Sequence, residues 1–108
     1  MRIGPRKPLE MAQTVLDEKI LLPIVKNTQF QREAFSILDR WAELTPEELK
    51  KLAEKPTALG IFLLTQQTKE QGVLRSETGE EQLRNGLTPH ELLEMNGIDQ
   101  SIYQYLES

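Results

Sequence analysis

Apolar residues in this chain recur at intervals of three and four, and proline, glycine or a capping residue interrupts the pattern every few turns. Such spacing places the apolar side chains on one face of an α-helix, whereas a half-buried strand would alternate at every second residue. No segment shows that alternation between hairpin turns, and only residues 72–77 could form a short extended piece. The sequence therefore predicts an all-α fold, a small bundle of five to seven helices.

The length and composition fit one domain with one core. The chain has 108 residues, of which 38% are hydrophobic and 28% are charged, and chains of this size commonly form one domain. The first eight residues contain two prolines, a glycine and three basic side chains. We therefore expect an irregular basic arm at residues 1–8 and a single helical domain at residues 9–108, with Trp41 in its core.

Two helix starts share one pattern. The segments LTPEEL and LTPHEL each place a threonine before a proline and a glutamate three residues after the threonine. These residue types form a capping box, in which side chains satisfy the free N–H groups at a helix start. We expect such boxes at Thr45 with Glu48, at Thr88 with Glu91 and, with glutamine, at Thr28 with Gln31.

Proline and glycine set the expected boundaries of two further helices. The first helix begins at Leu9, and Pro23 should end or kink it because proline lacks an N–H and clashes with the preceding turn. Another helix begins after Thr57 and is apolar nearly all round over two turns. We expect this helix to be the most buried one and to end at Gly72.

The inventory of reactive side chains excludes several kinds of site. The chain has no cysteine and one histidine, His90, which excludes disulfide scaffolds, thiolate zinc sites, iron–sulfur clusters and cysteine nucleophiles. His90 and Glu94 share a helix face, but a zinc site needs at least a third protein ligand. Paired carboxylates occur as sequence neighbours, which do not face each other across a cleft. We therefore expect no enzymatic activity, no metal and no cofactor.

The glycine-spaced segment at residues 72–86 has two interpretations. It holds Arg75, Ser76, Thr78 and Arg84, and glycines allow backbone N–H groups to approach a phosphate, so it could bind an anion or a partner. It has no phosphate-loop motif, however, and its glutamates would repel an anion. We favour a connector, a loop followed by a short helix, because glycines mostly serve turns and caps.

Residues 87–107 resemble a helix-turn-helix, with a capped helix, a glycine turn and a last helix that Asp99 caps. Residues 85–108 contain no lysine or arginine and four acidic residues. A recognition helix lies beside phosphates and needs cations nearby, so we do not expect nucleic-acid binding. The alternative function is a nucleic-acid-binding regulator that uses residues 87–107 and the basic arm.

The sequence shows no export signal and no membrane span. Charged residues interrupt the region that follows the N-terminal basic residues, where a signal peptide would be apolar. The longest apolar runs are far shorter than the roughly 20 residues that cross a bilayer. We expect a soluble cytoplasmic protein without membrane association.

These observations favour a protein that acts by binding another protein, as an adaptor, a regulator or an assembly subunit. The first expected helix carries a wider apolar stripe than a short terminal helix needs to pack on its own core. Such a helix can lie in a groove of a partner or form the seam of a homo-oligomer. The candidate partner-binding residues are Leu9, Met11, Val15, Leu16, Ile20 and Leu22.

Overall fold

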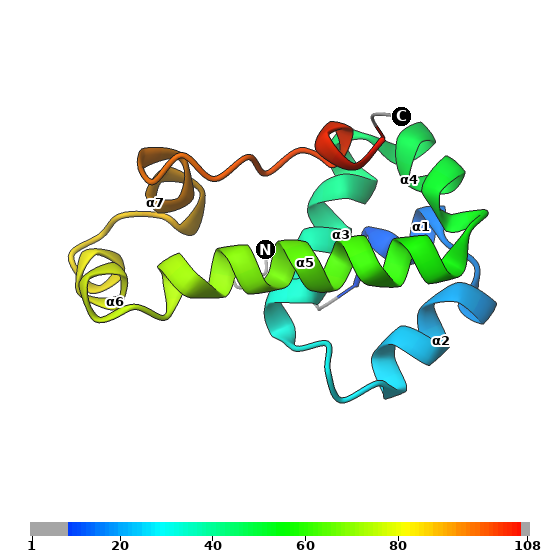
Figure 1. The fold of residues 1–108 in the computed structure, drawn as a ribbon, viewed down its shortest axis with the longest axis horizontal. Coiled ribbons are helices and arrows are strands. Elements are labelled where there is room, and N and C mark those ends of the chain that lie inside the picture. The colour runs from blue at the N-terminus through cyan, green and yellow to red at the C-terminus, as the bar shows by residue number, and fades with distance from the viewer. Residues whose placement is uncertain (1–8, 107–108) are drawn as a thin grey trace, which may run out of the picture.

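Figure 1 shows a long helix, α5 (Pro56–Leu74), that crosses the molecule, with the other helices arranged along it and beyond its end. The structure is a computed structural model and describes residues 9–106; the basic arm expected at residues 1–8 lies outside them. The other elements are α1 (Ala12–Val15), α2 (Glu18–Lys26), α3 (Arg32–Leu44), α4 (Pro46–Ala53), α6 (Glu77–Arg84), α7 (Pro89–Met95) and the 3₁₀ helix η1 (Ile102–Tyr105). The described residues contain no strand, so the predicted all-α fold is confirmed.

The prediction of one helix from Leu9 to Pro23 is wrong, because the chain breaks after α1. Leu16 has an extended backbone, with a ψ of 139°. The Asp17 side chain then accepts a hydrogen bond of 2.8 Å from the backbone N–H of Lys19. This contact starts a new helix, since a side-chain oxygen satisfies one of the N–H groups left free at a helix start. Pro23 lies inside α2 and does not end it.

One carboxylate of α3 holds the N-terminal end of the described chain. Asp39 accepts hydrogen bonds from the backbone N–H groups of Leu9 at 2.8 Å and Ala12 at 2.9 Å. Leu9 has a φ of 65°, in the left-handed region that bulky side chains rarely adopt. Its burial and its bond to Asp39 stabilise this conformation, so α1 is attached to the core.

The main core lies where α3, α4 and α5 meet. Its largest fully buried apolar side chains are Trp41, Ile37, Leu38, Leu49, Leu59, Leu63 and Ile102. Burial of a large aliphatic side chain contributes about 1.5–3 kcal/mol relative to leaving it in water. Trp41 is 1% exposed, so its predicted place in the core is confirmed.

The buried face of α5 continues beyond its apolar residues. Gln66, Gln67 and Glu70 follow Leu63 at helical spacing, and each is at most 3% exposed. Buried polar groups are costly unless they form hydrogen bonds, and all three side chains do so. The helix is not buried all round, because Ile61 is 58% exposed.

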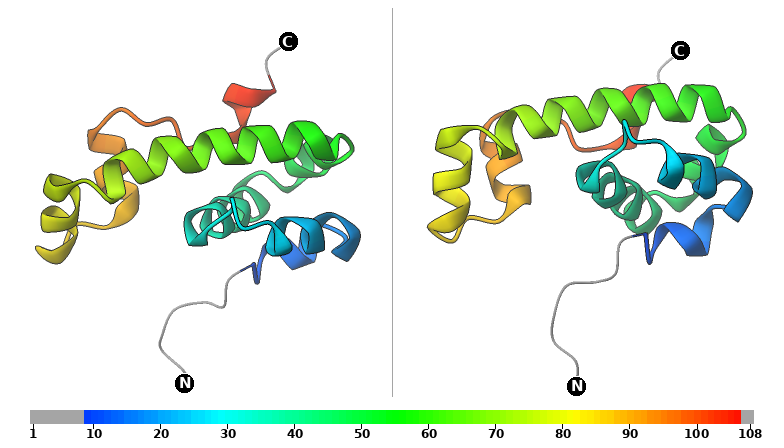
Figure 2. Two further views of the ribbon diagram at one scale, coloured as in Figure 1. Left: turned by 60° about the horizontal axis from the view of Figure 1, so that its bottom comes forward. Right: turned by 90° about the horizontal axis from the view of Figure 1, so that it is seen from below.

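The predicted end of α5 at Gly72 is wrong. Gly72 lies inside α5, which continues to Leu74, and residues 72–77 form no extended piece. A glycine inside a helix costs only about 1 kcal/mol, so the packing of α5 overrides it. Ser76 then caps α6 by accepting a hydrogen bond of 2.9 Å from the N–H of Gly79. The two helices α6 and α7 form a hairpin at the end of α5, away from α1 and α2 (Figure 2).

Of the three predicted capping boxes, one forms. The Thr88 hydroxyl accepts a hydrogen bond from the Glu91 N–H at 3.1 Å, and the Glu91 carboxylate accepts one from the Thr88 N–H at 2.9 Å. The Thr45 hydroxyl instead donates to the Trp41 carbonyl at 3.0 Å, because Thr45 follows directly on α3. Residues 28–31 form no box, because α3 begins only at residue 32.

The last segment does not form a helix-turn-helix. After α7, residues 98–101 run as an extended link, and only the four-residue η1 follows. η1 packs near α4, at some distance from α7 (Figure 1). The expected last helix is present only as this short 3₁₀ helix, and its N-cap residue is Ser101, so the prediction that Asp99 caps it is wrong. The Asp99 side chain accepts a hydrogen bond from the Ser101 N–H at 2.9 Å, and the extended link carries Ile102 into the main core.

Candidate interaction sites on helix α2 and in an arginine-lined cleft

The six residues predicted to bind a partner do not share one surface. Leu9 and Leu16 are 7% and 5% exposed and belong to the main core. Three more are half-buried against that core: Met11, Val15 and Ile20. Leu22 alone of the six is well exposed, at 43%. The break between α1 and α2 turns most of the predicted stripe inward, so the stripe as a whole is not a free surface.

The outer side of α2 forms a short surface, the α2 face, which consists of Glu18, Leu22, Val25 and Lys26. Leu22 and Val25 are apolar but 43% and 48% exposed. A groove of about 400 Å³ runs beside them between α1 and α2. Single exposed apolar residues are common on proteins, whereas two neighbours beside a groove form a candidate contact surface.

The two ends of the α2 face carry opposite charges. Glu18 lies in the first turn of α2 and Lys26 in the last, an order that the helix dipole favours. Neither side chain has an ion pair or a hydrogen bond within residues 9–106. Each lies four residues from Leu22. The α2 face therefore runs from acidic through apolar to basic.

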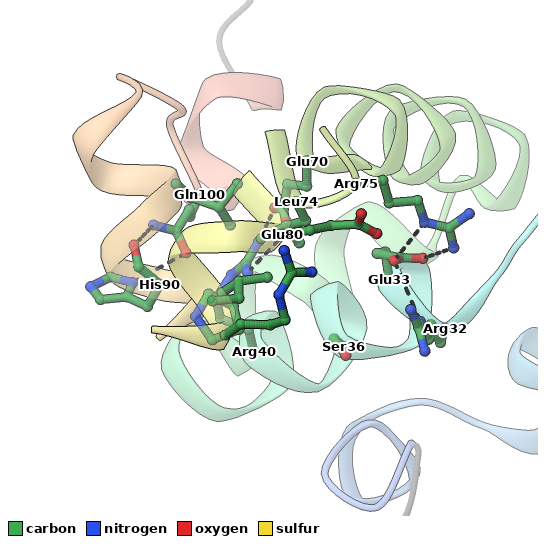
Figure 3. Close-up of a pocket in the computed structure, with 14 residues that line it drawn as sticks. Arg32, Glu33, Ser36, Arg40, Glu70, Leu74, Arg75, Glu80, His90 and Gln100 are labelled. Carbon is green, nitrogen blue, oxygen red and sulfur yellow. Dashed lines mark hydrogen bonds and ion pairs between the residues drawn. The ribbon is translucent and has the colours of Figure 1, made fainter. Parts of the chain in front are cut away.

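A larger cleft, of about 730 Å³, lies between α3 and the α6–α7 hairpin (Figure 3). The C-terminal end of α5 and the link before η1 complete its walls. Four arginines line the cleft: Arg32, Arg40, Arg75 and Arg84. Three glutamates line it as well: Glu33, Glu70 and Glu80. This concentration of charge makes the cleft the second candidate site.

Glu33 joins α3 to the end of α5 at one end of the cleft (Figure 3). Its buried carboxylate accepts two hydrogen bonds from Arg75, at 2.7 and 3.0 Å, and one from Gln71 at 3.1 Å. Burial acts to raise the pKa of Glu33, but the hydrogen bonds from Arg75 and Gln71 outweigh it and lower the pKa below its ordinary value. Glu33 is therefore ionised and paired at neutral pH.

A second buried carboxylate, Glu70, binds Arg40 across the cleft floor. The Nη2 atom of Arg40 donates to Glu70 Oε2 at 2.5 Å, and Gln66 donates to the same oxygen at 2.8 Å. Gln66 also donates to the Asp99 carbonyl at 2.9 Å and accepts from the Tyr105 hydroxyl at 2.5 Å. Burial, with the charges of Glu70 and Asp99, raises the pKa of Tyr105 to about 12, so its hydroxyl stays protonated. This network attaches the C-terminal link to α5.

Two arginines of the cleft keep free hydrogen-bond donors. Arg84 has no ion pair and no side-chain hydrogen bond within residues 9–106. The side chain of Arg32 is 84% exposed, and its Nε atom lies 3.6 Å from Glu33, which Arg75 already binds. Glu80 accepts no hydrogen bond from another described side chain. Among the described residues, Arg84 and Glu80 are therefore the charges of the cleft without an ion pair, and Arg32 has only its loose contact with Glu33.

His90 lies at the edge of the cleft and contacts the link before η1. Its Nδ1 atom is 3.1 Å from Gln100 Oε1, and its Nε2 atom is 3.8 Å from Glu94 Oε2. The side chains of His90 and Glu94 are 66% and 73% exposed. Residues 9–106 contain no group of three side chains that could hold a metal ion. The pair that the sequence placed on one helix face is a surface contact.

The segment at residues 72–86 both connects two helices and lines the cleft. Ser76 caps α6 and Thr78 is exposed, whereas Arg75 and Arg84 line the cleft. This segment can therefore serve both as a connector between helices and as part of a binding site, the two interpretations that its sequence left open. The sequence carried no indication that two arginines of α3 line the same cleft, because only the packing of α3 on α5 brings them there.

No protein-family model, no curated protein and no solved structure matches the chain. Within residues 9–106, every helix is too short or too polar to cross a membrane.

Proposed function

We propose that this chain is a non-catalytic binding protein that associates with a second copy of itself through the α2 face. The observation that carries the proposal is the order of that face, which runs from acidic through apolar to basic. Most soluble homo-oligomers are two-fold dimers, in which the same patch of both copies forms the interface. Such a patch must complement itself, and the α2 face does so.

Antiparallel pairing of two α2 helices about an axis at Leu22 would satisfy both charges. Glu18 and Lys26 each lie four residues from Leu22, which is about 6 Å along a helix. Glu18 of each copy would then lie beside Lys26 of the other, on both sides of the axis. Leu22 and Val25 of the two copies would bury one another between these ion pairs. Parallel pairing would instead bring like charges together.

The interface would be small. α2 has nine residues and is about 14 Å long, and the groove between α1 and α2 adds to the contact area. Interfaces at the low end of the usual range of area are transient. We therefore expect a dissociation constant that is roughly micromolar or weaker.

The buried carboxylates support binding rather than catalysis. A general base must be free to accept a proton from a substrate. Both oxygens of Glu33 are held by Arg75, and both oxygens of Glu70 are held by Arg40. These two pairs join α3 to α5, so they act as structural links between helices.

Sedimentation velocity tests the proposal, over a protein concentration from roughly 10 μM to 1 mM, which brackets a weak dissociation constant. We expect the mass to rise with concentration from 12.4 kDa towards twice that value. Leu22→Glu should abolish the rise, because it places a charge at the centre of the interface. Met95→Glu is the matched control, since Met95 is an exposed apolar residue of α7. A wild-type chain that stays monomeric throughout would contradict the proposal.

A further inference from the structure

The cleft between α3 and the α6–α7 hairpin lies apart from the α2 face, and its walls point to a different ligand. We infer that the cleft binds a small organic anion, with a carboxylate or phosphate head on the free guanidinium of Arg84 and an apolar body against its leucines. This inference does not depend on self-association through the α2 face.

The size of the cleft suits a small molecule. Its volume is about 730 Å³, and pockets that hold small ligands are usually ≈ 300–1,000 Å³. Its walls come from α3, α5, α6, α7 and the link before η1, so a ligand would contact groups far apart in the sequence.

The free hydrogen-bonding groups of the cleft are mostly donors. The carboxylates of Glu33 and Glu70 have both oxygens bound to side chains of the protein, with Glu70 Oε1 held only by a 3.5 Å bond from Arg40, so they offer little to a ligand. The guanidinium of Arg84 and the hydroxyl of Ser36 have no side-chain partner within residues 9–106, and Arg32 is largely exposed. A complementary ligand must therefore bring acceptors.

The unpaired charge of the cleft favours an anion. The Arg40–Glu70 and Arg75–Glu33 pairs cancel, which leaves Arg84 and Arg32, the latter with only a 3.6 Å contact to Glu33, against Glu80. The cleft thus carries one net positive charge in a chain whose formal net charge is −4. Arginine binds carboxylate and phosphate through two parallel hydrogen bonds, which are stronger than bonds between neutral groups.

The remaining wall of the cleft is apolar. Leu74 at the end of α5, Leu83 of α6 and Leu93 of α7 line it, together with Pro89. An inorganic ion would leave this wall in contact with water. A ligand with a ring or a short aliphatic chain would cover the wall, since burial of apolar area stabilises a complex.

Nuclear magnetic resonance titration of the full chain tests this inference with four probes: phenyl phosphate, benzoate, inorganic phosphate and the neutral benzyl alcohol. We expect phenyl phosphate or benzoate to shift amide signals of residues 72–100 saturably, with a dissociation constant that is roughly millimolar for so small a probe. Whichever of the two binds more tightly identifies the preferred head group. Inorganic phosphate and benzyl alcohol, which each lack one half of the ligand, should bind more weakly than that probe.

Three variants separate recognition in the cleft from general charge effects. Arg84→Gln should weaken binding roughly tenfold or more, as loss of a charge-assisted hydrogen bond does, and Glu80→Gln should tighten it. Lys51→Gln removes an exposed charge from α4 and should change nothing. The inference is wrong if neither organic anion shifts these signals saturably, if benzyl alcohol binds equally well, or if Arg84→Gln and Lys51→Gln have equal effects.

Discussion

The indole of Trp41 illustrates how single side chains join distant parts of this fold. Its ring is buried and lies edge-on to Tyr105, with 5.9 Å between the ring centroids. Its Nε1 atom donates a hydrogen bond of 3.1 Å to the Gln100 carbonyl. Trp41 is thus part of the core and also satisfies a backbone group of the C-terminal link.

Replacement of Trp41 should separate these two contributions. Trp41→Ala should lower the free energy of unfolding by about 3–5 kcal/mol, the usual cost of removing a large buried aromatic side chain. Trp41→Phe keeps most of the packing and should cost less, largely through the lost hydrogen bond to Gln100. Urea denaturation measures both values. Coincident midpoints for Trp41→Ala and wild type would contradict the buried position.

The Glu33–Arg75 pair predicts a defined dependence of stability on pH. The pKa of Glu33 lies below its ordinary value of 4.5 in the folded chain, so its contribution is complete above about pH 4.5 and is lost as the pH falls through the folded pKa. Glu33→Gln should lower the free energy of unfolding by roughly 1–3 kcal/mol at neutral pH. Denaturation at a series of pH values should show this difference shrinking in acid, and a constant difference would contradict the assignment.

Helical periodicity predicted the apolar core residues but missed the buried polar ones. Gln66, Gln67 and Glu70 continue the stripe of Leu59 and Leu63 at spacings of three and four. Their position on that stripe was a signal of burial, but their polarity favours a solvated face. Only the partners supplied by α3 and the C-terminal segment make their burial favourable.

Among the helices, local caps decided boundaries that hydrophobic spacing could not. The apolar pattern continues without interruption from Leu9 towards Pro23, yet Asp17 begins a new helix in its midst. The box at Thr88 and Glu91 formed as predicted, at the exposed start of α7. The Thr45 hydroxyl instead donates a hydrogen bond to the Trp41 carbonyl of α3, so no box forms there. Sequence patterns therefore located most helices and misplaced several of their ends.

The α6–α7 hairpin depends on a glycine that has no room for a side chain. A Cβ atom at Gly79 would clash with the Val73 carbonyl oxygen and lie 2.8 Å from Ser76 Oγ, the cap of α6. Gly79→Ala should therefore destabilise the hairpin by roughly 1–3 kcal/mol. Hydrogen exchange should become faster at residues 77–95 and stay unchanged in α3.

Gly72→Ala is the matched control for that experiment. A Cβ atom at Gly72 would meet no atom within 4 Å, and the residue lies inside α5. Alanine there should raise the free energy of unfolding by about 0.5–1 kcal/mol, because it restricts the unfolded chain and favours the helix. Equal effects of the two substitutions on hydrogen exchange would contradict the role given to Gly79.

At the scale of the whole molecule, a local chain break creates one candidate site and long-range packing creates the other. The break after α1 leaves only the outer side of α2 exposed, and the α6–α7 hairpin stands off from α3 to form the cleft. Neither arrangement follows from periodicity, because the local cap at Asp17 sets the break after α1, and the direction of the chain after α5 sets the position of the hairpin. The resemblance of residues 87–107 to a helix-turn-helix failed for the same reason, since Ile102 packs in the core beside α4.

Charge reversal across the α2 face tests the central claim most directly. Glu18→Lys or Lys26→Glu alone would place like charges together at two positions of the dimer, which should weaken association roughly tenfold. The double variant, Glu18→Lys with Lys26→Glu, restores opposite charges at both positions, and sedimentation equilibrium should show association close to that of wild type. Two results would contradict antiparallel pairing of α2. The single variants could associate as tightly as wild type, or the double variant could associate as weakly as the single variants.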